Sequence, residues 1–248
     1  MKKSIYLFLP LLLAFTACQG QILKDLKDAA DKGREVMGGN SSGSALSNEE
    51  IVDGLKTALK VGADSAVAIT SANNGFYKNE LIYIPFPEEA VKAKEYALKM
   101  GLDSQVEKFE MTMNRAAEEA AKEAAPIFVD AITSMTVRDG YDILKGEDDA
   151  ATNYLRNTTT AELTEKFRPV VERAIEKVEL TKYWNPIVTK YNATTMFSGN
   201  EKVDPDLTAY ITQKAIEGLF VYIEKEEKNI RDNPQARVTE ILQKVFGS

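Results

Sequence analysis

The sequence has 248 residues, 44% of them hydrophobic, with 31 basic and 38 acidic residues, a formal net charge of −7 and no histidine. The absence of histidine excludes Ser-His-Asp and Cys-His nucleophile systems and imidazole ligands for a metal. The single cysteine, Cys18, excludes an internal disulfide and a thiolate zinc cluster. The acidic balance argues against nucleic acid as a partner, because phosphate binding needs a basic face. No glycine-rich phosphate loop or metal-binding motif is present, so we predict no cofactor and no metal.

The first 17 residues have the pattern of a secretory signal peptide. Lys2 and Lys3 precede an apolar run over residues 5–15, and small residues follow it. That run is too short to span a bilayer stably, since a spanning helix takes about 20 apolar residues. We therefore assign residues 1–17 to a signal peptide rather than to a transmembrane anchor.

The residues at the end of this segment, Phe15-Thr16-Ala17-Cys18, resemble the lipobox of bacterial lipoproteins, although Phe15 stands where an aliphatic residue is usual. The resemblance implies that Cys18 carries a lipid and begins the mature chain. Several acyl chains anchor a protein durably, because each buried methylene contributes about 0.8 kcal/mol. Gln19 stands where an aspartate would resemble an inner-membrane retention signal. We therefore expect attachment to a bacterial outer membrane, on its periplasmic face.

A tether is predicted over residues 18–46, because residues 38–44 are composed of Gly, Ser and Asn in the manner of a flexible linker. The helical domain is predicted to occupy residues 47–248. Ser47 and Glu50 have the spacing of a capping box, which places the start of the first helix there.

The stretch over residues 76–87 is the one part of the domain whose sequence is typical of an extended segment. Pro85 and Pro87 forbid a helix and disfavour a central strand. We expect an ordered loop that packs Ile82, Ile84 and Phe86 onto helices, with a functional lid as the alternative. A helix is predicted after Pro87, ending near Gly101.

The longest apolar stripe of the sequence runs over residues 104–135 with a period of about 3.6 residues, which predicts a helix capped by Ser104. Pro126 lies inside the stripe and would clash with the carbonyl of Lys122, so a kink or break is expected there. The side opposite the stripe is predicted to carry the charged residues Lys108, Arg115, Glu118, Glu119 and Lys122.

Several motifs in this helix and after it resemble a family of uncharacterised bacterial proteins catalogued as domain of unknown function forty-one ninety-seven. The matching residues are Met113-Asn114-Arg115-Ala116-Ala117, Met135-Thr136 with Asp139, Asp149-Ala150-Ala151-Thr152 with Tyr154 and Arg156, and the ending from Glu226-Glu227 to Arg237. The resemblance covers roughly residues 46–247. It implies an envelope location and a helical domain, and it implies no activity.

The remaining sequence also has helical periodicity. Thr136 and Asp139 form a second capping box, and Thr159 with Glu162 predicts a further helix start. Trp184 is interpreted as a core anchor, with a ligand platform as the alternative. A long helix ending at Asp232 and a short terminal helix follow. We therefore predict an all-α domain, a bundle of about seven to nine helices with one ordered proline-flanked extended loop.

Two carboxylates interrupt apolar stripes, Glu110 in the long helix and Glu226 in the last long helix. A buried carboxylate needs hydrogen bonds or a cation, so we expect both to be mostly buried and to contact an arginine, a lysine or an amide. The structural interpretation is a salt-bridge network between helices, and the functional one is a carboxylate pair or an arginine site for an anion. The candidate polar cluster comprises Glu110, Asn114, Arg115, Arg156, Glu226, Glu227, Arg231 and Arg237. Glu227 and Arg231, one turn apart, are expected to pair on the helix surface.

These features favour a lipid-anchored envelope protein with a non-enzymatic binding or structural role. The partner would be an envelope protein or a small ligand, and no catalytic residue is assigned. The alternative is a carrier of lipid or another apolar ligand in a cavity between helices. A third class, a carboxylate-based hydrolase, would need two carboxylates converging in one accessible pocket.

Overall fold

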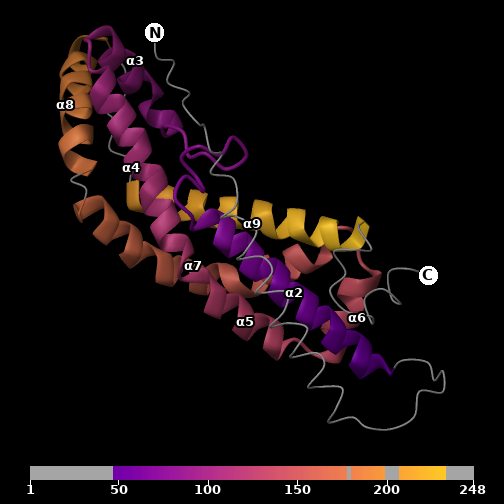
Figure 1. Ribbon diagram of the computed structural model, residues 1–248. Coiled ribbons are helices and arrows are strands. Elements are labelled where there is room, and N and C mark those ends of the chain that lie inside the picture. Colours follow the sequence, from indigo (N-terminus) through magenta and orange to yellow (C-terminus); the bar gives the residue numbers. More distant parts are fainter. Residues whose placement is uncertain (1–46, 178–179, 199–206, 233–248) are drawn as a thin grey trace, which may run out of the picture. The chain divides into compact units, whose positions relative to one another are not determined.

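The computed structural model describes residues 47–177, 180–198 and 207–232, all within one unit that begins at Leu46. The elements are α2 (Asn48–Thr70), the short 3-10 helix η1 (Glu88–Ala90), α3 (Val91–Lys99), α4 (Asp103–Ala121), α5 (Ala124–Ser134), α6 (Val137–Lys145), α7 (Ala150–Lys177), α8 (Leu180–Ser198) and α9 (Leu207–Asp232) (Figure 1). The described residues thus form eight α-helices and no strand, which confirms the predicted all-α bundle. The predicted signal peptide, tether and terminal helix, with Cys18 and Arg237, lie outside the described residues.

Two helix starts are determined by the predicted capping boxes. The amide of Glu50 donates to Ser47 Oγ at 3.2 Å, and the amide of Ser47 donates to the Glu50 carboxylate at 2.8 Å. The same reciprocal pair joins Thr136 and Asp139 at the start of α6. Each box satisfies two N–H groups that lack a partner inside the helix.

The long predicted helix is broken into α4 and α5 at Lys122 and Glu123. Pro126 becomes the third residue of α5, where its missing N–H disrupts no hydrogen bond within the helix. The break therefore falls at Lys122, the residue whose carbonyl the proline ring would meet in a continuous helix. The predicted cap at Ser104 is wrong, because α4 begins at Asp103 without a side-chain cap.

A second correction concerns α7, which is one helix of 28 residues where two were predicted. Thr159 lies inside it and its hydroxyl donates to the carbonyl of Leu155 at 2.6 Å. A Thr-x-x-Glu spacing therefore occurs here within a helix rather than at its start.

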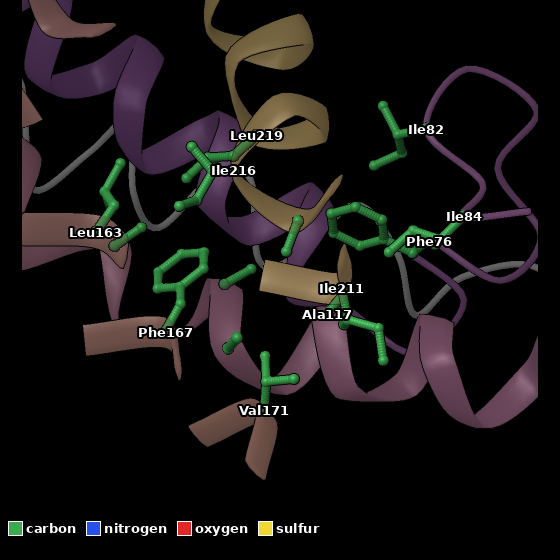
Figure 2. Packing of buried hydrophobic residues seen from close by; sticks show 14 of the residues in the cluster. Phe76, Ile82, Ile84, Ala117, Leu163, Phe167, Val171, Ile211, Ile216 and Leu219 are labelled. Atoms are coloured by element: carbon green, nitrogen blue, oxygen red, sulfur yellow. The ribbon is translucent and has the colours of Figure 1, made fainter. Parts of the chain in front are cut away.

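The helices pack around α9, which contacts α2, α4 and α7, and α4 also packs against α7. Helices α3 and α8 cover α4 towards one end of the bundle, while α5 and α6 pack against α2 and α7 towards the other (Figure 1). Figure 2 shows one cluster of buried side chains drawn from α4, α7, α9 and the segment between α2 and α3, among them Phe76, Ile82, Ile84, Ala117, Leu163, Phe167, Val171, Ile211, Ile216 and Leu219.

The segment over residues 71–87 has no helix but is packed into this core. Ile82, Ile84 and Phe86 are buried, as the sequence analysis expected, and Phe76 is fully buried. A Cβ atom at Gly218 would lie 2.6 Å from the ring of Phe76, so the glycine permits this close approach. The backbone polar groups of such a buried irregular segment need partners outside it.

Trp184 lies in the same core. Its ring stacks on that of Phe109 with centroids 4.7 Å apart, and it is 6% exposed. This burial agrees with the interpretation of Trp184 as a core anchor. None of the helices in the described residues is both long enough and apolar enough to cross a membrane.

Candidate functional site

The carboxylate of Glu227, on α9, lies at the first turn of α7. Its Oε1 accepts a hydrogen bond from the amide of Ala151 at 2.9 Å, and its Oε2 accepts from the amide and the hydroxyl of Thr152, both at 2.8 Å. The first N–H groups of a helix have no partner within it, and the helix dipole favours a negative charge there. Glu227 therefore caps α7 from another helix, and it is only 4% exposed.

Arg231, one turn further along α9, completes this contact. Its Nε and Nη2 donate to Oε1 of Glu227 at 3.1 and 2.7 Å, and Nη2 also donates to the carbonyl of Ile143 in the last turn of α6 at 3.1 Å. The Glu227–Arg231 pair predicted on the helix surface is therefore present, but its place was predicted wrongly. The two side chains are 4% and 12% exposed, because the ends of α6 and α7 cover them.

A second polar contact is a row of three residues on α4, namely Glu110, Asn114 and Glu118, spaced one turn apart. Asn114 is fully buried at its centre. Its Oδ1 accepts from the amide of Ile84 at 2.8 Å, and its Nδ2 donates to the carbonyl of the same residue at 3.0 Å. The side-chain amide thus satisfies both backbone groups of a buried residue in the irregular segment.

Glu118 accepts two further N–H groups of that segment. Its Oε1 accepts from the amides of Phe76 and Tyr77, both at 3.1 Å, and its Oε2 pairs with Arg115 Nη1 at 2.5 Å. It is 5% exposed, so its predicted place on the solvent side of the helix is wrong. The signal that identifies it is the four-residue step from Asn114, which places both residues on one strip of the helix.

Glu110 ends the row and is the least deeply buried of the three. Its side chain is 16% exposed and forms an ion pair with Lys94 of α3 at 2.5 Å. It also accepts a hydrogen bond from Tyr83, whose hydroxyl pKa is raised by burial, then by the charge of Glu110 and by this hydrogen bond. Glu110 therefore has the burial and the lysine partner that its position in the stripe predicts.

Glu226 is half-buried where α2 packs on α9. The hydroxyl of Ser65 donates to its Oε1 at 3.1 Å, so the structure supplies a neutral hydroxyl where a cation or an amide was expected. Glu110 and Glu226 have partners from different elements. The structure thus distributes the predicted cluster over separate contacts between helices.

Arg115 and Arg156, the two arginines chosen as candidates from the family resemblance, contact different residues. Arg156 is half-buried, and its guanidinium lies 4.5 Å from the centroid of the Phe220 ring. Besides its pair with Glu118, Arg115 donates from Nη2 to Asn74 Oδ1 at 2.7 Å, and it lies over the ring of Tyr77. Both are held by packing as well as by charge.

A groove of about 390 Å³, open to solvent, lies between α4 and α7. Thr112, Ala116 and Val170 line it and are buried, so they form its floor. Charged side chains stand around that floor, namely Arg115, Glu119 and Glu123 on the α4 side and Arg173 on α7. The sequence analysis missed this groove, because it arises from the docking of two helices that are distant in sequence.

Among the residues that the structure describes, no group of three or more acidic, histidine or cysteine side chains is placed to hold a metal ion. In the part of the chain that the structure describes, buried charges thus join helix ends and fix an irregular segment, and a groove lined by charged side chains lies between α4 and α7.

The family described as Protein of unknown function (DUF4197) matches residues 45–247. The chain therefore belongs to this family, as its motifs indicated. No curated protein and no solved structure matched the chain.

Proposed function

We propose that this protein is a lipid-anchored component of the bacterial cell envelope with a non-enzymatic binding role, exerted through the groove between α4 and α7. The groove is the observation that carries the proposal. Its volume of about 390 Å³ lies within the range of about 300 to 1,000 Å³ that is usual for small-ligand sites.

The buried carboxylates support a structural rather than a chemical use of the other candidate residues. Glu118 accepts backbone N–H groups of the irregular segment, and Glu227 accepts those at the start of α7. Both also pair with an arginine of their own helix. Both carboxylates are buried, and each accepts hydrogen bonds at both of its oxygens, so they hold parts of the chain together.

The other two candidate functions match the groove less well. A purely apolar ligand or lipid would make no favourable contact with the four charged side chains around the floor. Glu119 and Glu123 both stand on the α4 side of the groove. Glycoside hydrolysis needs two carboxylates on opposite sides of the bond that is cleaved.

The binding role is tested by crosslinking in cells. A photoreactive amino acid is placed at Glu123 in the groove, and at the exposed Asn157 on α7 as the control. A specific adduct from position 123 that position 157 does not form supports the role. Equal labelling from both positions, or none, contradicts it.

The anchor is proposed on the resemblance of residues 15–18 to a lipobox, with the outer membrane as its location. Its test is Cys18→Ser followed by cell fractionation. The substituted protein should leave the membrane fraction. If it stays there as tightly as the original, a lipid on Cys18 is not what holds it.

A further inference from the structure

We propose that the groove between α4 and α7 binds a short zwitterionic peptide, with its carboxylate at Arg115 and Arg173 and its ammonium group at Glu119 and Glu123. The inference rests on the proposed binding role and names the class of ligand. Two arginines and two glutamates line the groove. A ligand with two separated opposite charges can pair with all four side chains, whereas a simple anion or cation can pair with only two of them.

The side chain of Arg115 is already ordered without a ligand. Its guanidinium is fixed by Glu118 Oε2 and Asn74 Oδ1, and it lies 5.7 Å from the centroid of the Tyr77 ring. These two bonds use one N–H of Nη1 and one of Nη2, and a guanidinium carries five donors. The remaining donors of an already ordered arginine bind a carboxylate at a small cost in side-chain entropy.

The charges follow one another along the α4 side of the groove. Glu119 lies one turn after Arg115 and Glu123 stands in the break before α5. At a rise of about 1.5 Å per residue, Arg115 lies roughly 6 Å from Glu119 and roughly 12 Å from Glu123 along α4. An extended peptide covers at most about 3.5 Å per residue, so the two ends of a tripeptide fit this separation.

The negative end of the groove can accept an ammonium group. Glu119 is paired with Lys122, but the two side chains are 56% and 53% exposed. An exposed pair of this kind contributes at most about 1 kcal/mol, so a ligand ammonium can compete for the carboxylate. Glu123 is exposed and lies beside it at the rim.

The floor of the groove determines the side chains that the peptide carries. Ala116 and Val170 at the floor, and the half-buried Ala174, line the groove with apolar surfaces, which favour small side chains such as those of alanine. Thr112 adds a hydroxyl at the floor, where the peptide backbone offers both donors and acceptors.

Isothermal titration of the full-length protein in detergent with trialanine tests the proposal. Saturable binding of one peptide per chain is expected, and N-acetyl-trialanine amide, which has neither terminal charge, should not bind. Arg173→Gln and Glu123→Gln should each weaken trialanine binding by about fivefold to tenfold, the effect of losing one charge-assisted contact. Arg168→Gln, on α7 but outside the groove, is the matched control and should bind as the original does.

The orientation is tested with N-acetyl-trialanine, which keeps only the carboxylate. Its affinity should fall with Arg173→Gln and should not change with Glu123→Gln. Absence of saturable binding, equal binding of the doubly blocked peptide, or variants without effect would overturn the proposal. If trialanine fails to bind while position 123 still crosslinks to a partner in cells, the peptide inference fails and the binding role stands. If both fail, the proposed function fails as well.

Discussion

One oxygen of Glu227 accepts two hydrogen bonds from Thr152, one from the amide and one from the hydroxyl, each 2.8 Å long. The two residues belong to α9 and α7, which lie far apart in the sequence. A residue near the end of the described chain therefore accepts the hydrogen bonds of two amides in the first turn of α7, those of Ala151 and Thr152. Arg231 also donates a hydrogen bond to the carbonyl of Ile143 on α6, so α6, α7 and α9 meet at the Glu227–Arg231 ion pair.

Glu227→Ala should lower the free energy of unfolding by about 3 to 5 kcal/mol, the effect of leaving one member of a buried ion pair alone. The variant leaves the Arg231 guanidinium without its carboxylate and the first amides of α7 without an acceptor. Urea denaturation measures the loss. Replacing both Glu227 and Arg231 by leucine should cost less than Glu227→Ala does, because no buried charge then remains.

The neighbouring residue provides the matched control. Glu226→Ala should cost only about 1 kcal/mol, because its partner is a neutral serine hydroxyl and the site is half-buried. If Glu226→Ala and Glu227→Ala destabilise equally, the contact with the start of α7 is not what makes Glu227 important.

Asn114→Leu should destabilise by about 2 to 3 kcal/mol, because it leaves the buried N–H and C=O of Ile84 without partners. Hydrogen exchange should detect the loss locally, as faster exchange of the Ile84 amide. Asn157→Leu, at an exposed position of α7, is the control for the change of residue type. Unchanged protection of Ile84 in the Asn114 variant would contradict the role assigned to its side chain.

Replacing glycine by alanine should change the stability of the protein in opposite directions at Gly218 and at Gly62. At Gly218 the added Cβ would lie 2.6 Å from the Phe76 ring, and overpacking of this kind costs about 1 to 3 kcal/mol. At Gly62 it would lie 3.4 Å from Glu226 Cβ, an ordinary contact, so the higher helix propensity of alanine should stabilise by up to about 1 kcal/mol. Thermal unfolding of Gly218→Ala and Gly62→Ala compares them, and the same sign of effect in both would contradict the packing described.

The capping box of α6 predicts a pH dependence. Hydrogen bonds from the hydroxyl and the amide of Thr136 lower the pKa of Asp139. A carboxyl whose pKa is lowered by folding stabilises the protein above its unfolded pKa of about 3.9, and that stabilisation is lost as the pH falls through the folded pKa. Asp139→Asn should therefore lower stability at pH 7 by a few tenths of a kcal/mol, since the site is exposed, and this difference should shrink below about pH 4. A stability difference between Asp139→Asn and the original that does not shrink as the pH is lowered from 7 to 3 would contradict this role of the Asp139 carboxylate.

Helix positions and several helix ends were predictable because they depend on residues that are close in sequence. The boxes Ser47–Glu50 and Thr136–Asp139 need only a spacing of three residues, and the break before Pro126 follows from the proline ring. The same local rule misplaced a helix start at Thr159. A threonine within a helix can donate to a carbonyl one turn back, here that of Leu155, and so needs no free helix end.

The partners of the polar residues were not predictable in the same way. Glu118 accepts hydrogen bonds from Phe76 and Tyr77, about 40 residues earlier in the chain. Periodicity indicates which side of a helix is apolar, but not that an irregular segment will cover part of its polar side. The four-residue step from Asn114 to Glu118 was visible in the sequence, yet only the docked segment explains why both are polar.

The pairing of α2 with α9 determines when the domain can be completed during synthesis. Ala58 of α2 packs against Ile230 of α9. At about 5 to 20 residues per second, roughly 10 to 35 s separate the synthesis of these two residues. Throughout that interval α5 and α6 can already pack on α2, but the side of α2 that contacts α9 stays without this native neighbour.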